Sequence, residues 1–502
     1  MHKAEISSIE VGQLSFTFAF PENDEAQETQ MSTAVRLAHP RGASAGLPAD
    51  AVSTPRTVCL DIRSSEQDKA LLFGPKPVKR KWNSLIDKVY APRNLQSAWE
   101  KVKSNDGAAG VDGMTVSRFD REAPKLLEAL SRDLREKRYR PSPVRRAMIP
   151  KAGGGQRPLG IPTVRDRIVQ QALRQILEPI FEAKFSTRSH GFRPERGCQT
   201  ALAVVDHAIR FGYTWVVDAD IRSFFDSVDH EKLIDAVAEE VADGRILKLI
   251  RQILKSGVQL PSVQGIEPTD TGTPQGGPVS PLLANIFLHV FDEQMVKAGY
   301  GLVRYADDWV VFAKSESEAR EALEKARQIL EGDLGLVLHP EKTRVVSVAS
   351  GFEFLGFHYF IDPKIGWVCK EVRRGSVLRF RNAIRARTPR LRNQRPFKER
   401  HATFKRLRKN KRLEAMIEDM NRYLSGWHGY FKMVRPRYDD VFRSFDEFIR
   451  RRLRSSVTGR TGNGWWTAKI TNRMWRELGL ICLTERHQKY LKTTGHATAA
   501  AR

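Results

Sequence analysis

The chain has 502 residues, of which 41% are hydrophobic, and this length and composition fit a folded protein with two to four domains. Its 84 Lys and Arg residues outnumber its 59 Asp and Glu residues, so the net charge is +25, and nucleic acid is the expected partner. The four cysteines stand singly, which excludes a zinc site, and no stretch approaches the ~20 apolar residues of a membrane span, so we expect a protein of the bacterial cytoplasm.

The first 80 residues are expected to form a poorly structured N-terminal extension. The stretch "HPRGASAGLPADAVSTPRT" is rich in Ala, Ser, Pro and Gly and has neither helical nor strand periodicity. From residue 81 to about 360, amphipathic helical patterns alternate with short apolar strands, which is typical of an α/β or α+β domain.

Two pairs of aspartates stand in predicted strands or turns of this region. The stretch "TWVVDADI" (Thr214–Ile221) predicts a strand on which Asp218 and Asp220 share one face. A carboxylate in an apolar strand is costly to bury unless it is paired or bound to a metal ion. Further on, "GLVRYADDWVVFAKS" predicts a strand, a turn and a strand, with Asp307 and Asp308 at the turn. Taken alone, the second pair could be ordinary turn residues or metal ligands.

Most of the excess positive charge lies in the C-terminal part of the chain. Residues 371–460 contain 27 basic and 9 acidic residues, a net charge of +18. A solvated helix face with interspersed signs would be closer to balance, so the imbalance favours binding to nucleic acid. Apolar residues recur every three or four positions from Leu413 to Trp427, which predicts the buried stripe of a helical domain.

Several blocks of sequence, in order, resemble the group II intron-encoded reverse transcriptases, also called maturases. The blocks "DIRSFFD", "GTPQGGPVSPLLANIFL" and "RYADDWVVF" are similar to the palm of that family. Blocks on either side are similar to its N-terminal motif, its fingers and the close of its palm: "NDGAAGVDGMT", "IPKAGGGQRPLGIPTVRDRIVQQAL", "SHGFRPERG", "LGLVLHPEKTRVV" and "FEFLGFHYF".

The resemblance covers roughly residues 82 to 455 and implies an α+β, right-hand polymerase fold. Fingers and palm, an antiparallel sheet plus helices, are expected over residues 81–360. An α-helical thumb or maturase domain, also called domain X, is expected over 361–455. A short basic C-terminal tail would follow over 456–502.

The resemblance also implies a nucleotidyl-transfer site with two metal ions. Asp220 corresponds to the first metal-binding aspartate of such polymerases, and Asp307 and Asp308 correspond to the pair in the family's YxDD turn. The carbonyl of Ile221 is implied as a further ligand. The expected cofactor is Mg²⁺, as two ions, with Mn²⁺ as a substitute. Because successive residues at a tight turn point apart, Asp308 is expected to hold its metal less directly.

Four residues are implied in binding the incoming deoxynucleotide (dNTP). Phe225 corresponds to the aromatic residue that excludes a 2′-hydroxyl, although without the resemblance it would be read as a core phenylalanine. Lys151 and Arg157 flank a glycine-rich turn and suit binding of the triphosphate. Gln275 corresponds to the loop beside the nascent base pair, whereas the two glycines after it could equally form an ordinary turn before a helix.

A further set of basic residues is implied in binding RNA or primer. Arg193 and Lys342 resemble contacts to the template or primer backbone, with surface salt bridges as the alternative. In the family, the thumb grips the intron RNA and helps it fold for splicing. The residues expected to contact RNA there are Arg381, Arg385, Arg406, Arg408, Lys409, Lys411 and Arg412.

Residues 461–502 depart from the fullest pattern of the family. Many relatives end in a Cys- and His-rich nuclease domain, and this segment has one cysteine and no paired ligands, so nuclease activity is expected to be absent. The Trp and Arg residues of "GNGWWTAKITNRMWRELG" could stack on DNA bases, or they could form a small core.

The sequence leaves three functions open. The first is an RNA-directed DNA polymerase that is also a splicing maturase and moves its intron by target-primed reverse transcription. Its partners would be group II intron RNA, an RNA template, a DNA primer or target, and dNTPs. The second is a splicing cofactor without physiological polymerisation, which the intact aspartates argue against. The third is a domesticated reverse transcriptase, for example one serving bacterial defence. We expect the first, because the N-terminal motif and the basic thumb are both present.

Overall fold

The computed structural model describes residues 81–150, 155–260, 265–362, 366, 368–391, 400–434, 439–458 and 470–493. The extension expected over residues 1–80 lies outside this part of the chain. Among the described residues, no helix is both long enough and apolar enough to cross a membrane.

The described chain opens with helices and continues into a small sheet and a long buried helix. In chain order these elements are α2 (Ile86–Tyr90), α3 (Pro92–Asn105), α4 (Val116–Arg121), α5 (Ala123–Arg135), β1 (Val144–Pro150), β2 (Gln156–Ile161) and α6 (Val164–Glu182). Helix α3 buries Leu95, Trp99 and Val102, at spacings of three and four residues, and it packs against α6. β1 and β2 form an antiparallel hairpin, and the sheet order is β2-β1-β4-β5 once β4 (Val258–Gln259) and β5 (Ile266–Glu267) are added.

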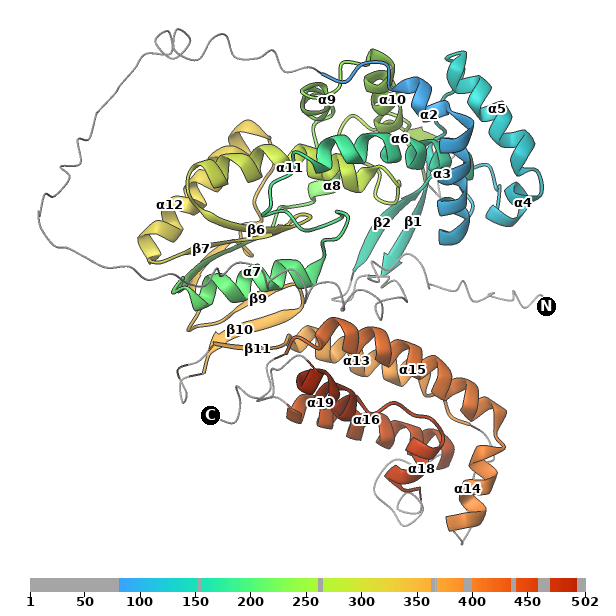
Figure 1. The fold of residues 1–502 in the computed structure, drawn as a ribbon, viewed down its shortest axis with the longest axis vertical. Helices are drawn as coiled ribbons and strands as arrows, with labels where there is room; N and C mark the ends of the chain where they lie inside the picture. Colours follow the sequence, from blue (N-terminus) through green and yellow to red (C-terminus); the bar gives the residue numbers. More distant parts are fainter. Residues whose placement is uncertain are drawn as a thin grey trace, which may run out of the picture. The chain divides into compact units, whose positions relative to one another are not determined.

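The second sheet carries both aspartate pairs. Its order is β6-β7-β3-β8, with every pair of neighbours antiparallel, and its strands are β3 (Trp215–Ala219), β6 (Gly301–Tyr305), β7 (Asp308–Ala313) and β8 (Arg344–Ser347). The helices that precede and connect these strands are visible in Figure 1: α7 (Cys198–Arg210), α8 (Phe224–Ser227), α9 (His230–Ala238), α10 (Gly244–Leu254), α11 (Ser280–Lys297) and α12 (Glu316–Arg327), the last continued by the π-helical turn η1 (Gln328–Asp333).

Side-chain alternation along β3 and β7 divides this sheet between two hydrophobic cores. One core contains the helices α3, α6, α9, α10 and α11 and takes Val217, Ala219, Trp309 and Val311 from the sheet. The other contains α7 and the C-terminal helices and takes Val216, Val310 and Phe312. Asp218 is two residues from Val216 and is paired with Val310, so it lies on the face of the second core.

A third sheet leads into the C-terminal helices. Its order is β11-β10-β9, from β9 (Phe352–Phe354), β10 (Phe357–Ile361) and β11 (Val368–Val372). The helices that follow are α13 (Arg374–Arg387), α14 (Arg400–Arg408), α15 (Lys411–Phe431), α16 (Asp439–Thr458), α18 (Asn472–Glu477) and α19 (Leu483–Thr493). Their core is aromatic: the ring of Phe380 lies 4.7 Å from that of Trp427 and 4.3 Å from that of Phe445. These elements confirm the expected α+β fold with a helical C-terminal region.

The boundaries expected from the sequence do not coincide with element boundaries. Residue 360 falls inside β10, and residue 455 falls inside α16. Helices α18 and α19 share the core of α15 and α16, to which Trp475 and Leu483 contribute fully buried side chains. The helices after residue 470 therefore pack into the same hydrophobic core as α15 and α16. For Trp475, this excludes base stacking in the described arrangement; the two tryptophans of "GWW" lie outside the described residues.

Candidate active site

The turn between β6 and β7 places Asp307 at the tip of a tight hairpin. Tyr305 pairs with Asp308, so Ala306 and Asp307 are its two central residues. Of these, only Ala306 has a positive φ, +58°, as in the first central position of a type II′ turn, where glycine is preferred. A non-glycine residue in this region costs about 1–3 kcal/mol and persists only where its surroundings hold it. The predicted strand, turn and strand are confirmed.

Asp220 lies immediately after β3, beside this hairpin. Ala219 pairs with Trp309, so the next residue of the chain, Asp220, comes opposite Asp308. Its carbonyl accepts a hydrogen bond from the His339 amide at 2.8 Å, and the Arg222 amide donates to Val337 at 2.8 Å. The backbone around the Ile221 carbonyl is thus fixed from both sides.

Asp218, which shares a predicted strand with Asp220, has a different partner. Its Oδ2 accepts hydrogen bonds from Nη2 and Nε of Arg344, at 2.9 and 3.1 Å. The strand therefore contains one carboxylate neutralised by an arginine of β8 and, at its end, a second one facing the hairpin. This ion pair with Arg344 reduces the free-energy cost of burying the Asp218 carboxylate.

Burial and neighbouring negative charges raise the pKa values of the two hairpin carboxylates, Asp307 and Asp308. Burial raises the pKa of Asp307, and the negative charge of Asp220 raises it further. Burial, together with the charges of Asp307 and Asp220, raises the pKa of Asp308 to about 7. Asp308 nonetheless remains exposed to solvent.

This donor set suits a divalent cation. Carboxylate oxygens are the ligands that Mg²⁺ prefers, and a cation between mutually repelling carboxylates would favour their ionised forms. Among the residues that the structure describes, no three His, Cys, Asp or Glu side chains are arranged closely enough to hold a metal ion as they stand. The positive charge beside Asp220 comes instead from Lys342, whose Nζ donates to Asp220 Oδ2 at 2.5 Å.

Two of the predicted nucleotide-binding residues contact each other across the β1–β2 hairpin and the loop before α11. Arg157 Nε donates to Gln275 Oε1 at 3.0 Å, and the Gly160 amide donates to the Gln275 carbonyl at 2.7 Å. The glycines that follow have no room for a side chain. A Cβ on Gly276 would lie 2.5 Å from the Gly160 carbonyl oxygen, and one on Gly277 would lie 2.4 Å from Gln170 Oε1. Close packing against backbone therefore requires Gly276, whereas a side chain at Gly277 would force the Gln170 side chain to shift. Lys151 lies outside the described residues.

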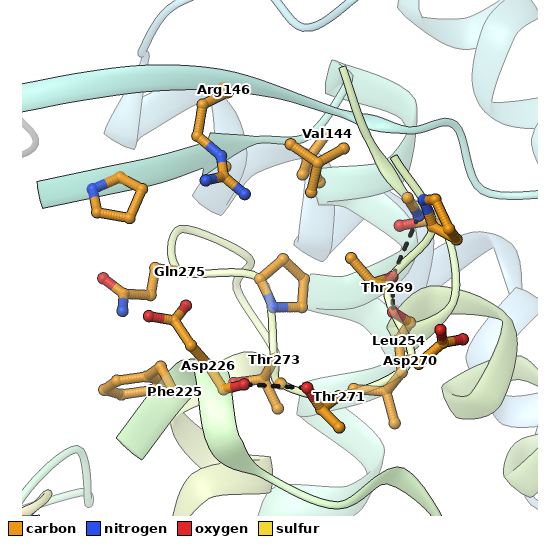
Figure 2. A pocket seen from close by; sticks show the side chains of 18 residues that line it. Val144, Arg146, Phe225, Asp226, Leu254, Thr269, Asp270, Thr271, Thr273 and Gln275 are labelled. Carbon is orange, nitrogen blue, oxygen red and sulfur yellow. Dashed lines mark hydrogen bonds between the residues drawn. The ribbon is translucent and has the colours of Figure 1, made fainter. Parts of the chain in front are cut away.

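A cavity of about 300 Å³ adjoins these residues (Figure 2). Arg146 projects into it from β1, and Phe225 and Gln275 form part of its wall. Two threonines of its lining donate to backbone carbonyls: Thr269 to Leu254 at 2.7 Å and Thr271 to Asp226 at 3.2 Å. Phe225 is 7% exposed and belongs to the first hydrophobic core. Phe225 therefore packs in the hydrophobic core and also lines the cavity.

Arg193 does not occupy the position of a backbone contact. Its side chain is 3% exposed, and its guanidinium donates to Glu182 at 2.7 Å and to the carbonyls of Ser186 and Ser189 at 2.5 and 2.8 Å. The structure thus contradicts the expectation of a surface contact to template or primer for this residue. Lys342 differs, since its side chain is exposed even though it is paired with Asp220.

The basic residues expected to bind RNA are spread over α13, α14 and the start of α15. The guanidinium groups of Arg381 and Arg385 lie over the ring of Phe448, 5.8 and 5.6 Å from its centroid. The side chains that reach solvent are those of Arg381, Arg385, Arg408, Lys409, Lys411 and Arg412, whereas Arg406 is half-buried. Lys411 pairs with Glu414 at 2.9 Å.

The sequence reasoning missed a buried network around Arg304, the residue before Tyr305. Arg304 and Asp292 are both fully buried and form an ion pair of 2.5 Å. A signal was available: "GLVRY" places an arginine in an apolar strand, and "LHVFDEQM" places an aspartate among apolar helix residues. Opposite charges in two neighbouring apolar elements indicate a buried pair.

Two families match separate parts of the chain. The family described as "Reverse transcriptase (RNA-dependent DNA polymerase)" matches residues 149–359, which include the whole candidate site. The family described as "Group II intron, maturase-specific domain" matches residues 397–475, within the C-terminal helices.

Three similar proteins extend this picture. Protein YkfC of Escherichia coli K12 is 35% identical over 335 residues, which cover 59% of this chain and 87% of YkfC. The uncharacterized 91 kDa protein in cob intron of Schizosaccharomyces pombe is 40% identical over 196 residues, covering 39% of this chain and 24% of that protein. The group II intron-encoded protein LtrA of Lactococcus lactis subsp. cremoris is 41% identical over 197 residues, covering 39% of this chain and 32% of LtrA.

Proposed function

The chain belongs to the family of group II intron reverse transcriptases with a maturase-specific domain, and we propose that it copies RNA into DNA at the site formed by Asp220, Asp307 and Asp308. The observation that carries this proposal is the approach of Asp220, at the end of β3, to the hairpin that carries Asp307 and Asp308, where the charge of Asp220 helps to raise the pKa values of both hairpin carboxylates. Ordinary turn aspartates have no reason to converge with a third carboxylate at the end of another strand.

We propose Mg²⁺, as two ions, for this site, with Asp220, Asp307, Asp308 and the Ile221 carbonyl as ligands. When bound, such ions would lower the pKa of the primer 3′-hydroxyl and stabilise the charge of the leaving pyrophosphate. The hairpin fixes the position of Asp307, and the pairing of residues 220–222 with 337–339 fixes that of Asp220. Lys342 would exchange its contact with Asp220 for one with the nucleic acid backbone.

Arg157 and Gln275 form the proposed nucleotide-binding wall. Their hydrogen bond holds the guanidinium beside the loop, and the planar guanidinium suits bidentate binding of a phosphate. Lys151, close by in sequence, would add a further positive charge to the triphosphate site. Phe225, on the adjoining cavity wall, would lie under the sugar and exclude a 2′-hydroxyl.

We predict that Phe225→Ala lowers the preference for deoxynucleotides over ribonucleotides by roughly 10-fold to 100-fold, the range over which an apolar pocket distinguishes a hydroxyl. The measurement is the ratio of kcat/KM for dATP and ATP in single-nucleotide extension. Phe224→Ala is the matched control, because Phe224 is 2% exposed and contacts the ring of Phe225 at 5.2 Å. Unchanged selectivity in Phe225→Ala, or an equal change in the control, would exclude this role.

The C-terminal helices are the proposed binding surface for intron RNA. Their exposed Arg and Lys side chains lie on the part of the chain with a net charge of +18, and contacts to phosphate give affinity without sequence readout. We propose that this binding supports splicing, and that the same protein then moves the intron by target-primed reverse transcription. Finding the reading frame inside a group II intron that this protein helps to splice would support mobility, whereas a frame outside any intron would favour a domesticated enzyme.

A further inference from the structure

The residue before Asp307 is held in a conformation that it would not adopt alone. Ala306 has a φ of +58°, and it is not glycine. Its side chain is buried, and a Cβ on Gly191 would come within 2.4 Å of its backbone nitrogen. The turn therefore packs tightly against the segment 188–191, which prevents its backbone from moving in that direction.

The side chain of Arg304 holds the other side of the turn. Its Nη1 donates to the Ala306 carbonyl at 2.8 Å, so the guanidinium reaches two residues along the chain to the peptide bond that leads into Asp307. The same nitrogen donates to Asn285 Oδ1 at 3.1 Å, and Asn285 Nδ2 donates to the Gly191 carbonyl at 2.8 Å. One network therefore connects the turn with α11 and with the segment that covers the turn.

Asp292 fixes the guanidinium. It accepts two parallel hydrogen bonds from Arg304, at 2.6 Å from Nε and 2.5 Å from Nη2, and both side chains have no exposed area. The backbone of Arg304 is held as well, since its amide donates to Arg188 at 2.9 Å and its carbonyl accepts from His190 at 2.9 Å. Hydrogen bonds therefore hold both the side chain and the backbone of Arg304.

A buried ion pair of this kind is a poor device for stability, because the cost of removing two charges from water often cancels their attraction. Two apolar side chains of similar volume would fill the same space. They could not hold the Ala306 carbonyl, which needs a directional donor. The Arg304–Asp292 pair therefore fixes the position of the turn, which an apolar pair would not do.

We propose that Arg304 is a positioning residue: with Asp292 and Asn285 it clamps the Ala306 turn and so fixes the direction in which Asp307 presents its carboxylate. The inference rests on the proposed role of Asp307 as a metal ligand. The clamp itself can be observed without any metal.

The test compares the double variant Arg304→Met/Asp292→Leu, which leaves no unpaired buried charge, with the wild type. We expect amide hydrogen exchange in peptides that cover residues 303–310 to become at least 10-fold faster. Direct binding of Mn²⁺, followed by the electron paramagnetic resonance signal of the free ion, should weaken about 10-fold to 100-fold, as for other groups that orient a ligand. The thermal midpoint should change by only a few degrees. Lys370→Met/Asp206→Leu is the matched control, because it removes an ion pair of 2.7 Å between β11 and α7, in which the Lys370 side chain is buried.

If amide hydrogen exchange at residues 303–310 is unchanged in the double variant, the proposed role of Arg304 in clamping the turn is wrong. Arg304→Lys is the second variant; it keeps a positive charge near Asp292 but loses the guanidinium fork, and it should show the same faster exchange at the turn. Failure of both variants to fold would also overturn the proposal, since it would assign Arg304 to the stability of the core. If Asp307→Asn binds Mn²⁺ as the wild type does, the metal assignment fails, while the exchange result still decides the clamp.

Discussion

Asp307→Asn is expected to reduce DNA synthesis on an RNA template by at least about 10³-fold, because loss of one preorganised electrostatic group already costs 10²–10³-fold in other enzymes. The substitution keeps the size of the side chain and the hairpin that carries it. It removes the negative charge that a divalent ion needs. Primer extension with a labelled DNA primer on an RNA template measures the effect, and binding of intron RNA should stay within about threefold of the wild type.

Asp218→Asn is the matched control for this experiment. Asp218 is a strand aspartate two residues from Asp220, yet its carboxylate is paired with Arg344. We expect Asp218→Asn to retain polymerase activity within about 10-fold. If Asp307→Asn still extends the primer, or if both variants lose activity equally, the assignment of the metal ligands is wrong.

Reversal of charge on the C-terminal helices should weaken binding of intron RNA and reduce its dependence on salt. Four exposed side chains are suitable: Arg385, Arg408, Lys409 and Arg412. Each lost phosphate contact lowers the slope of log K against log salt by about 0.7 to 0.9, so replacement of all four by Glu should reduce the slope by roughly 3. Filter binding or fluorescence anisotropy at several salt concentrations measures both the affinity and the slope.

The control for this variant changes charge elsewhere on the surface. Arg320 and Lys325 lie on α12, outside the C-terminal helices, and Arg320 forms only an exposed pair with Glu316. Their replacement by Glu should leave the slope unchanged, since exposed pairs contribute little. RNA binding that is unaltered in the four-residue variant would exclude α13–α15 as the main RNA surface.

The β6–β7 hairpin was the part of the candidate site that the sequence predicted best. Apolar runs on both sides of "ADD" indicate strands, and a two-residue loop between them fixes the register. The approach of Asp220 to this hairpin could not be read from periodicity, because pairing of β3 with β7 joins segments about 90 residues apart. It was expected only because the motifs resemble a known family.

Other residues show where sequence patterns stop being informative. An exposed arginine and a buried one look the same in a sequence, so the sequence left a template or primer contact and a surface salt bridge open for Arg193, whereas Glu182 and two carbonyls enclose its side chain. Asp218 and Asp220 looked equivalent, and only the position of Arg344 on β8 separates them. The partner of Arg304 depends on how α11 packs on β6, a tertiary contact that local patterns do not determine.

Primer extension by the purified wild-type chain on an RNA template is the decisive test of whether this protein copies RNA into DNA. With Mg²⁺ and dNTPs the protein should extend an annealed DNA primer to the end of the template, EDTA should stop synthesis, and added Mg²⁺ should restore it. Absence of extension with either Mg²⁺ or Mn²⁺, in a preparation that still binds the primer and template, would show that the protein is not an RNA-directed DNA polymerase.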